Sequence, residues 1–372
     1  MTRNNFSNNY LFLVLCCAFI SFNFIPVNLI YILGFLLTII GIISLLKSLK
    51  MNRITSVYIL FSTLFLTFQF IGLYSENNHN LDSKNILSPL LFYFSWLISI
   101  FIPKFLPNTK REERKITYKK SINLAIIFLF IELLTRLTLY NPSRGFIYAL
   151  KSSYFYFDSN FSGLIIASLI SFSLYLKLRL GLKLTHQLIA LTVLLFLTFS
   201  RGAILTTFIV YITFYSIKYF KIRAYITLFA TVVFFCYMTY QYLFLDMNFQ
   251  SIDGSFNSKF YIFKLAYDLF PELSLNNKLF GIGLGNTELY LGFFAHNIFV
   301  TFFLEFGILG SFLFLLFVTY TIIKSNSFTL FIWLPTLIGG VSLFGAYSPY
   351  IFILATIILS EEISFKFNRI DS

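Results

Sequence analysis

The sequence predicts an all-α, polytopic membrane protein with about 12 transmembrane helices. Of its 372 residues, 58% are hydrophobic and only 12% are charged, and its mean hydropathy is +0.80. Soluble domains carry about 25% charged residues, roughly twice that share. Apolar runs of about 20 residues recur along the chain, which is the length that a helix needs to cross a hydrocarbon core of about 30 Å. These runs are apolar on all sides, whereas barrel strands alternate in polarity, so we expect helices that satisfy their own backbone groups.

The apolar runs place the predicted spans in order. They are residues 10–25, 27–46, 54–73, 86–103, 120–140, 160–178, 185–200, 202–219, 222–245, 296–323, 326–344 and 346–362. We interpret the first run as a span, because no clear small-residue cleavage site of a signal peptide follows it. Cys16, Cys17 and Cys236 have the spacing of neither a disulfide framework nor a metal site. Since the spans fill most of the chain, residues 1–372 are predicted to form a single transmembrane domain.

The basic residues predict which way the protein crosses the membrane. Twenty of the 28 lysines and arginines fall in one set of alternate loops, together with the two chain ends, and eight fall in the other set. Positive charge concentrates in cytoplasmic loops, so we expect both termini in the cytoplasm. Orientation and contact with anionic membrane lipid then explain the net charge of +13, and no nucleic-acid partner is needed.

Arg201 is the most unusual of the eight outward basic residues. It lies in Phe199-Ser200-Arg201-Gly202-Ala203, a turn with almost no loop between two predicted spans. An arginine so close to hydrocarbon is unfavourable unless it snorkels or has an anionic partner. Two interpretations stay open at this point, a snorkelling residue at a helix end and an anion-binding residue that faces a cavity.

Two long loops lie on the outer side of the predicted topology, over residues 141–159 and 246–295. The first contains Arg144 and an aromatic run that leads into Asp158. In the second, aromatic residues beside Lys259 follow one helical stripe; they are Phe256, Phe260, Phe263, Tyr267 and Phe270. We expect an amphipathic helix lying flat on the membrane with its aromatic side chains in the interface. A membrane-resting lid without chemistry is the alternative.

His296 is the first candidate for catalysis among the three histidines. It lies where the outer loop re-enters the membrane, directly before Asn297, and an imidazole there can exchange protons with water near neutral pH. The preceding Gly281-Ile282-Gly283-Leu284-Gly285 lacks the strand and the βαβ unit of a dinucleotide fingerprint. We interpret these glycines as a flexible turn that lets the backbone approach the bilayer or a ligand. His79 and His186 are interpreted as ordinary solvated residues.

Three more ionisable residues lie inside predicted spans. Glu305 follows His296 by nine residues, about 13 Å along a helix, so the two side chains are not expected to pair directly. An ionisable group at that depth is a functional candidate by default, although Glu305 could equally tie helices together. Glu132 and Arg136 are four residues apart on one span and can neutralise each other.

Several of these motifs, taken in order, resemble the O-antigen polymerase and O-antigen ligase superfamily. The resemblance covers residues 196–312. It rests on Ser200-Arg201-Gly202-Ala203 after an apolar span, the long outer loop, the Gly281–Gly285 run, His296-Asn297, Leu304-Glu305-Phe306-Gly307 and Gly310. Phe157-Asp158-Ser159-Asn160-Phe161 also resembles a pattern before a central span in that superfamily. Elsewhere the likeness is limited to hydropathy and the number of spans.

The resemblance implies a multi-pass protein of the bacterial inner membrane whose outer loops, including the large loop 246–295, are periplasmic. It implies transfer of a glycan from an undecaprenyl diphosphate carrier, with Arg201 binding the diphosphate and His296 acting as general base. Lys259 stands where related chains commonly have Arg, and lysine cannot form the bidentate fork of a guanidinium. The other predicted substrate-binding residues are Arg136, Arg144, Asp158, Asn297 and Glu305. A polysaccharide chain-length regulator is a partner that follows from the resemblance alone.

The residues make this chemistry reasonable on their own. A diphosphate leaving group gains negative charge as the anomeric bond breaks, and fixed cations stabilise that transition state more than the ground state. A neutral imidazole can take the proton of the acceptor hydroxyl, an effect typically worth about 10²–10⁴-fold. No carboxylate cluster suggests a metal site, so we expect a metal-independent, inverting transfer without a cofactor.

Three other functions stay open. A ligase would share the chemistry but transfer the glycan to lipid A–core. The aromatic chain with few outer basic residues favours a polymerase, which needs no site for a highly phosphorylated core. A lipid-linked oligosaccharide flippase would be expected to show two matching halves and charges in a central cavity, for which Glu132 and Glu305 are the only candidates. A structural scaffold does not explain Arg201 or His296.

Overall fold

The computed structural model describes residues 3–25, 28–48, 51–74, 83–139, 145, 150–156, 158–245, 247–251, 254–295, 297–344 and 349–370. Over these ranges the chain forms helices, and the β-type contact seen there is an isolated bridge between Ser152 and Asp158. The prediction of an all-α fold is therefore confirmed.

Seven helical segments among the described residues are long and apolar enough to cross a membrane. They are Leu29–Leu46, Arg53–Tyr74, Ile86–Asn108, Arg111–Thr138, Ser159–Leu180, Phe220–Phe244 and Ile298–Lys324. Three further apolar helices are shorter, namely α9 (Thr185–Phe196), α10 (Arg201–Phe214) and α17 (Leu330–Gly340). The chain is therefore a helical membrane protein, while the count of about 12 spans stays a prediction.

Every predicted span overlaps at least one helix of the structure. The other long helices are α1 (Arg3–Cys16), α2 (Leu29–Ser48), α3 (Arg53–Tyr74), α4 (Ser83–Ile100), α6 (Arg111–Thr138), α8 (Ser159–Leu180), α11 (Phe220–Phe244), α12 (Gly254–Leu269), α16 (Gly307–Lys324) and α18 (Tyr350–Ile370). The short elements are α5 (Ile102–Phe105), η1 (Leu106–Asn108), η3 (Phe270–Glu272), α13 (Leu275–Phe280), α14 (Thr287–Leu291), α15 (Ile298–Val300) and the π-helical turn η4 (Thr301–Phe306).

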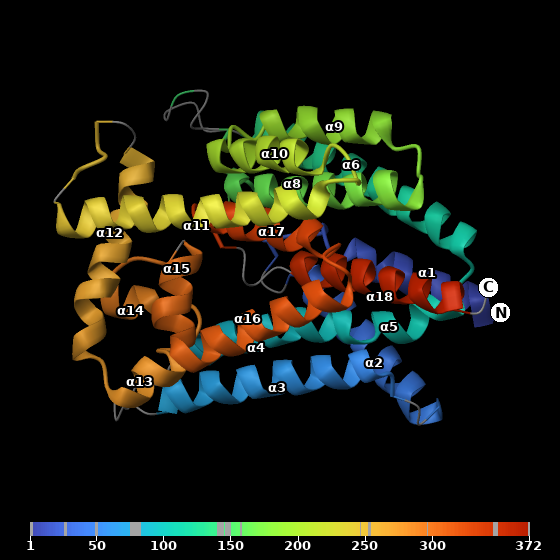
Figure 1. The fold of residues 1–372 in the computed structure, drawn as a ribbon, viewed down its shortest axis with the longest axis horizontal. Coiled ribbons are helices and arrows are strands. Elements are labelled where there is room, and N and C mark those ends of the chain that lie inside the picture. Colours follow the sequence, from blue (N-terminus) through green and yellow to red (C-terminus); the bar gives the residue numbers. More distant parts are fainter. Residues whose placement is uncertain are drawn as a thin grey trace.

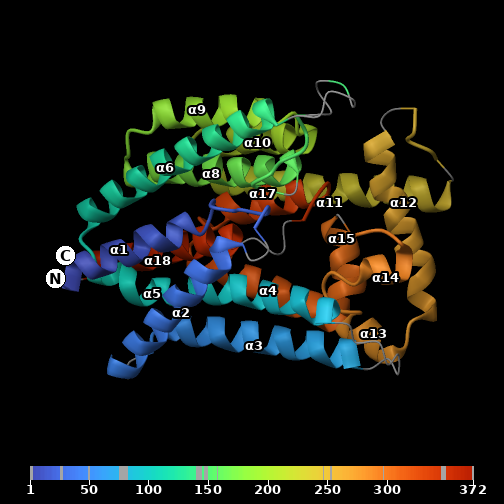
Figure 2. The same cartoon turned by 180° about the vertical axis from the view of Figure 1, so that it is seen from behind.

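Most helices run along the long axis of the molecule, and both chain termini lie at one end (Figure 1). α6, α8, α9 and α10 form one layer, and α3, α4 and α16 form another, with α1, α17 and α18 between them (Figures 1 and 2). At the end opposite the termini, α12 lies across the bundle axis beside α13 and α14 (Figure 1). We call the end that carries α12–α14 the distal end, and the end that carries both termini the terminal end.

α8 and α18 lie at the centre of the bundle. α8 is mostly buried, because its Ser, Gly and Ala residues let neighbouring helices approach closely. A Cβ at Gly163 would come within 2.8 Å of the Cβ of Ala203, so α8 and α10 meet through their backbones. Aromatic rings fill much of the remaining core, and Trp96 of α4 stacks on Phe352 of α18 at a centroid distance of 4.9 Å.

Two buried carboxylates of α18 tie helices together at the terminal end. Glu361 accepts from Nε and Nη2 of Arg114 on α6 at 2.7 and 2.9 Å. Glu362 accepts from Nε and Nη2 of Arg179 on α8 at 2.9 and 3.0 Å. Each carboxylate also accepts from a tyrosine hydroxyl. Glu361 and Glu362 are thus buried carboxylates inside the bundle, as Glu132 and Glu305 are.

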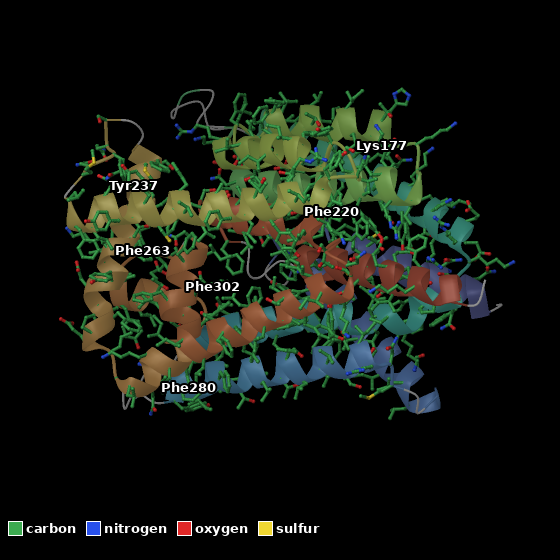
Figure 3. The ribbon with its side chains drawn as sticks, viewed as in Figure 1. Lys177, Phe220, Tyr237, Phe263, Phe280 and Phe302 are labelled. Carbon is green, nitrogen blue, oxygen red and sulfur yellow. The ribbon has the colours of Figure 1, made fainter. Side chains whose placement is uncertain are left out.

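The predicted amphipathic helix of the long loop is confirmed as α12, but its aromatic stripe packs against protein. Phe260 is only 2% exposed and stacks on Phe235 of α11 at a centroid distance of 5.6 Å. Phe263 lies on the side of α12 that faces α11 and α15 (Figure 3). Within the stripe, Tyr267 alone is exposed. The stripe attaches α12 to α11 and η4, because ring contacts and the burial of apolar surface stabilise this packing.

Candidate functional site

The distal end brings together the start of α8 and the middle of α12. Asp158 begins α8 as its N-cap residue, and its carboxylate accepts from the N–H groups of Asn160 at 2.7 Å and Phe161 at 3.2 Å. N–H groups in the first turn of a helix have no partner within the helix, so an aspartate there satisfies them. Its negative charge also suits the positive end of the helix dipole. Asp158 is therefore held in one place by the helix that it begins.

Ser200 connects the start of α10 to the start of α8. Its hydroxyl donates to the side-chain carbonyl of Asn160 at 2.9 Å and does not cap its own helix. Ala203 is buried against α8, and Gly202 packs on Ser342 so closely that a Cβ would overlap the Ser342 hydroxyl. Three of the four residues in the Ser200–Ala203 motif therefore fix the position of α10.

Arg201 is the fourth residue of that motif and the first residue of α10, and its side chain is exposed. The backbone before it is unusual, because Phe199 has a φ of +53°, which a non-glycine residue rarely adopts. Such strain clusters at functional sites. The first-turn N–H groups and the guanidinium give the start of α10 two sources of positive charge. An exposed guanidinium at a helix start suits a snorkelling residue as well as an anion-binding residue, so the role of Arg201 stays a prediction.

Lys259 and Asn297 meet although they are 38 residues apart in the chain. Asn297 is fully buried and begins α15 by accepting from the N–H of Val300 at 2.8 Å. Its amide nitrogen donates to the main-chain carbonyl of Lys259 at 3.3 Å. This hydrogen bond fixes the height of α12 relative to the segment in which the sequence predicts the catalytic base.

The side chain of Lys259 is half-buried and lies close enough to Asp158 to interact with its charge. Burial lowers the pKa of Lys259 below its ordinary value, because desolvation disfavours the ammonium form, and the carboxylate of Asp158 offsets part of that shift. A bound anion would add to the effect of Asp158 and stabilise the ammonium further. The site therefore suits a ligand that carries negative charge.

These contacts form one connected group at the distal end, which we call the polar chain. Its members, each joined to the next by a hydrogen bond or, between Asp158 and Lys259, by charge interaction alone, are Ser200, Asn160, Asp158, Lys259 and Asn297. Arg201 is covalently next to it. Together with the neighbouring Arg201, the group has one carboxylate and two cations, and it includes the starts of α8 and α10, so its net character is positive. Such an arrangement can bind a phosphate or diphosphate.

Arg136 lies apart from the polar chain, in a buried ion pair. Its Nε is 3.0 Å from Oε1 of Glu132, and the two side chains are 2% and 1% exposed. Its Nη1 donates to the carbonyls of Leu150 at 3.2 Å and Leu197 at 3.3 Å, and Ser153 donates to Glu132 at 2.6 Å. The pair neutralises itself, as its spacing predicts. It joins α6 to the segment before α8 and to the end of α9.

Glu305 is buried in η4 and holds the glycine turn. Its carboxylate accepts from the hydroxyl of Thr287 at 2.7 Å, from the hydroxyl of Thr301, and from the N–H groups of Gly285 and Thr287. Gly281 has a φ of +83°, and a Cβ there would overlap the carbonyl oxygen of Glu305. The glycines do let the backbone make a close approach. The backbone of Gly281 approaches the backbone of Glu305. The prediction that it approaches the bilayer or a ligand is therefore wrong for Gly281.

Three residues of this region were missed as functional or positioning groups. Asn160 and Ser200 stand inside the quoted motifs, but only the folded chain brings them together. Gln69 of α3 donates to the carbonyl of Glu305 at 3.2 Å and accepts from the N–H of Leu284 at 2.8 Å. The available signal for Gln69 was a lone amide in an apolar span, where a polar side chain is usually retained for a purpose.

Two predicted site residues, His296 and Arg144, lie outside the described residues, and their roles stay predictions. The residue after His296 is Asn297, whose contacts with α12 and α15 are given above. Within the described part of the chain, no group of three or more His, Cys, Asp or Glu side chains could hold a metal ion.

Comparison with known proteins adds no assignment. No protein-family model matches the chain, and neither does any curated protein. The function is therefore inferred from the order of the motifs and from the geometry of the distal end.

Proposed function

We propose that the protein is an O-antigen polymerase. In this role it transfers the growing glycan from undecaprenyl diphosphate to a new lipid-linked repeat unit, at the periplasmic face of the bacterial inner membrane. The observation that carries the proposal is the polar chain, which gathers Asp158, Lys259 and Asn297 near Arg201. Asn297 directly follows His296 in the sequence. Asp158, Arg201 and Asn297 come from three separate motifs of the superfamily that the sequence resembles, and Lys259 comes from the long outer loop.

The proposed topology has about 12 spans, with both termini in the cytoplasm and the loop 246–295 in the periplasm. Both termini lie at the terminal end and α12–α14 lie at the distal end, which agrees with that topology (Figure 1). Lys177, one of the twenty basic residues assigned to the cytoplasmic side, lies toward the terminal end (Figure 3). The donor lipid would then approach the polar chain from the outer leaflet.

In the proposed reaction, the hydroxyl oxygen of the acceptor sugar attacks the anomeric carbon of the donor glycan. The bond from that carbon to the diphosphate oxygen breaks, and undecaprenyl diphosphate leaves with the bonding electrons. His296 takes the proton of the hydroxyl, and the configuration at the anomeric carbon inverts. Arg201 and Lys259 stabilise the charge that grows on the leaving diphosphate, so they act mainly in the transition state.

The remaining residues of the site act as positioning residues in this proposal. Asp158 keeps Lys259 charged until the diphosphate arrives, and Asn297 fixes the backbone of Lys259 relative to His296. Arg136 and Glu305 were first considered for substrate binding, but both side chains are buried and interact with other groups of the protein. We therefore propose that these two residues support the site without touching substrate.

The proposal is tested by deleting the gene in its host and separating the lipopolysaccharide on a silver-stained gel. A polymerase defect leaves core that carries a single repeat unit, because ligation continues without chain growth. Re-expression of the wild-type chain should restore the ladder, and His296→Ala should not. His186→Ala is the matched control, since His186 lies at the start of α9, at the terminal end, and should restore the ladder fully.

Other gel patterns would contradict the polymerase assignment. Bare core without any repeat unit would indicate a ligase, or a flippase if lipid-linked repeats accumulate on the cytoplasmic side. A full ladder with His296→Ala, at wild-type protein level on an immunoblot, would rule out the role of His296 as general base. An unchanged ladder in the deletion strain would remove O-antigen as the substrate.

A further inference from the structure

An apolar groove opens between α8, α9 and α10. Its volume is about 580 Å³, and no acidic residue lines it. The lining is mainly aliphatic and aromatic; it includes Leu178, Leu188, Ile189, Val193, Phe196 and Tyr211. Ile189, Val193 and Phe196 are each more than half exposed, so the groove opens to the outside of the bundle. In a membrane protein that outside is occupied by lipid.

The polar atoms in the middle of the groove already have partners. The hydroxyl of Thr192 donates to the carbonyl of Leu188 at 2.7 Å and lies 2.8 Å from the hydroxyl of Tyr211. A polar ligand in this part of the groove would lose its own hydrogen bonds to water without gaining others. A hydrocarbon chain has no hydrogen bonds to lose, so it is the ligand that the apolar wall of the groove favours.

Lys177 lines the groove at its end toward the termini (Figure 3). It lies in the last turn of α8 with its side chain exposed, and no other described residue forms a hydrogen bond or ion pair with it. Its neighbour Arg179, in contrast, is paired with Glu362. At the same rim, the guanidinium of Arg223 lies 3.9 Å from the ring centroid of Tyr215. The rim therefore holds two cations and a tyrosine, as expected at a lipid headgroup level.

We propose that the groove binds one anionic phospholipid from the leaflet at the terminal end. Its phosphate lies beside Lys177, and one acyl chain follows the apolar wall toward Phe196. Basic pockets between helices on the cytoplasmic side of a membrane select acidic headgroups, because an anionic phosphate adds attraction to the lysine to the apolar contact of the acyl chain. An uncharged lipid would fill the wall equally well but would leave Lys177 unpaired. The site goes beyond the proposed glycosyl transfer, and it does not depend on that function.

The test is native mass spectrometry of the purified full-length protein, incubated with equal amounts of phosphatidylglycerol and phosphatidylcholine that carry the same acyl chains. The wild-type chain should retain phosphatidylglycerol in preference to phosphatidylcholine. Lys177→Ala should lower the retention of phosphatidylglycerol by about fivefold, since one basic residue near a membrane surface contributes on that scale. Val193→Trp should lower the retention of both lipids, because the indole occupies the groove.

Matched variants separate the groove from the rest of the surface. Lys324→Ala removes another exposed lysine at the end of a helix, and Val232→Trp enlarges a valine on α11 that is 45% exposed and lies outside the groove. Both should retain lipid like the wild type. Equal retention of phosphatidylglycerol by Lys177→Ala and the wild type would overturn the proposal. A co-purified polyprenyl phosphate that the groove variants release, in place of a phospholipid, would overturn it as well.

Discussion

At the scale of single residues, Lys259 shows how a side chain can be prepared for a ligand. Burial alone disfavours its positive charge, and the nearby Asp158 carboxylate restores part of it. Asp158 is itself held by two N–H groups of α8, so it cannot swing away when Lys259 is drawn toward an anion. The ammonium group is therefore poorly satisfied by the protein, which leaves affinity for a diphosphate.

The lowered pKa of Lys259 gives a pH-dependent prediction. The lysine is cationic below its pKa, so the rate of glycan transfer should fall as the pH rises through that value. Because the pKa is lowered, the fall should begin below the range of an ordinary lysine, whose pKa is about 10.4. The Lys259→Arg variant should keep a positive charge at this position over the whole pH range, so its transfer rate should not decline at alkaline pH. The measurement is the transfer rate in proteoliposomes as a function of pH.

Removing the positive charge of Lys259 provides a second test of its role in glycan transfer. Lys259→Ala should slow transfer by roughly 10- to 100-fold, since a hydrogen bond to a charged group contributes about 1.5–3 kcal/mol. Lys264→Ala is the matched control on the same helix, because Lys264 lines a separate pocket with Tyr261 and Asp268. An alkaline decline that survives in Lys259→Arg would assign the titration to another group.

The sequence predicted many of these residues individually but not their connections. Asp158, Arg201, Lys259 and Asn297 stood in motifs that could be recognised in order. The hydrogen bond from Ser200 to Asn160, in contrast, joins residues 40 positions apart, and no local pattern encodes it. Contacts of this kind depend on how two helices cross, which sequence periodicity does not specify.

At the scale of elements, the glycine turn and η4 pack against each other through close backbone contacts at the distal end. A Cβ at Gly72 would overlap the carbonyl oxygen of Gly281, and a Cβ at Gly307 would overlap the nitrogen of Gly281. Gly281 and Gly307 also have φ values of +83° and +67°, which favour glycine. Three chain segments therefore meet by direct contact of their backbones, and Glu305 closes the contact with its hydrogen bonds.

The contribution of the Glu305 hydrogen bonds to the stability of the protein can be measured with Thr287→Val. The change removes the hydroxyl that donates to the buried carboxylate of Glu305 and keeps the shape of the side chain. It should lower the free energy of unfolding by about 1–3 kcal/mol, because a buried acceptor loses a partner. Thermal unfolding in detergent measures the effect.

Thr207→Val is the matched control for that experiment. The Thr207 hydroxyl is buried and has no hydrogen-bond partner among the described residues, so its removal should be neutral or stabilising. Equal losses of unfolding free energy in the two variants would show that the hydrogen bond from Thr287 to Glu305 does not stabilise the fold.

From the sequence, the glycines predicted a turn, but the segment against which the turn packs emerged only from the tertiary structure.

At the scale of the whole molecule, α18 is the element that holds the terminal end together. Its two adjacent glutamates reach in different directions, Glu361 to α6 and Glu362 to α8. The Arg114–Glu361 pair is almost fully buried, with the two side chains 7% and 1% exposed. Breaking such a pair leaves a buried charge without compensation, which is far more damaging than the loss of a surface pair.

Glu361→Gln should therefore destabilise the protein by about 3–5 kcal/mol, as expected when one partner of a buried pair is removed. Glu112→Gln is the control, since Glu112 pairs with Lys115 at 2.8 Å on the exposed side of α6 and should leave unfolding unchanged. Unfolding in detergent, followed by circular dichroism, compares the two. A Glu361→Gln variant as stable as the control would mean that packing, and not the ion pair, holds α6 to α18.

The overall architecture was the most predictable part of the protein. Hydropathy alone indicated a helical membrane protein, and each predicted span overlaps a helix, because the need to satisfy the backbone in lipid leaves few other choices. Which helices form the interior was not predictable. α8 and α11 are both apolar, yet α8 is mostly buried and α11 mostly exposed. The difference follows from small residues and partner helices, which hydropathy does not count.

The shortness of α9 and α10 has a consequence for the surrounding bilayer. With 12 and 14 residues, they extend for about 18 and 21 Å, well short of a hydrocarbon core of about 30 Å. Under the proposed topology this hydrophobic mismatch requires the bilayer to thin around the two helices, or polar side chains to reach outward from their ends. Thinning would lower the headgroup plane toward the start of α10. The phosphate of a neighbouring lipid could then reach Arg201 while the hydrocarbon chain of that lipid stays inside the bilayer core.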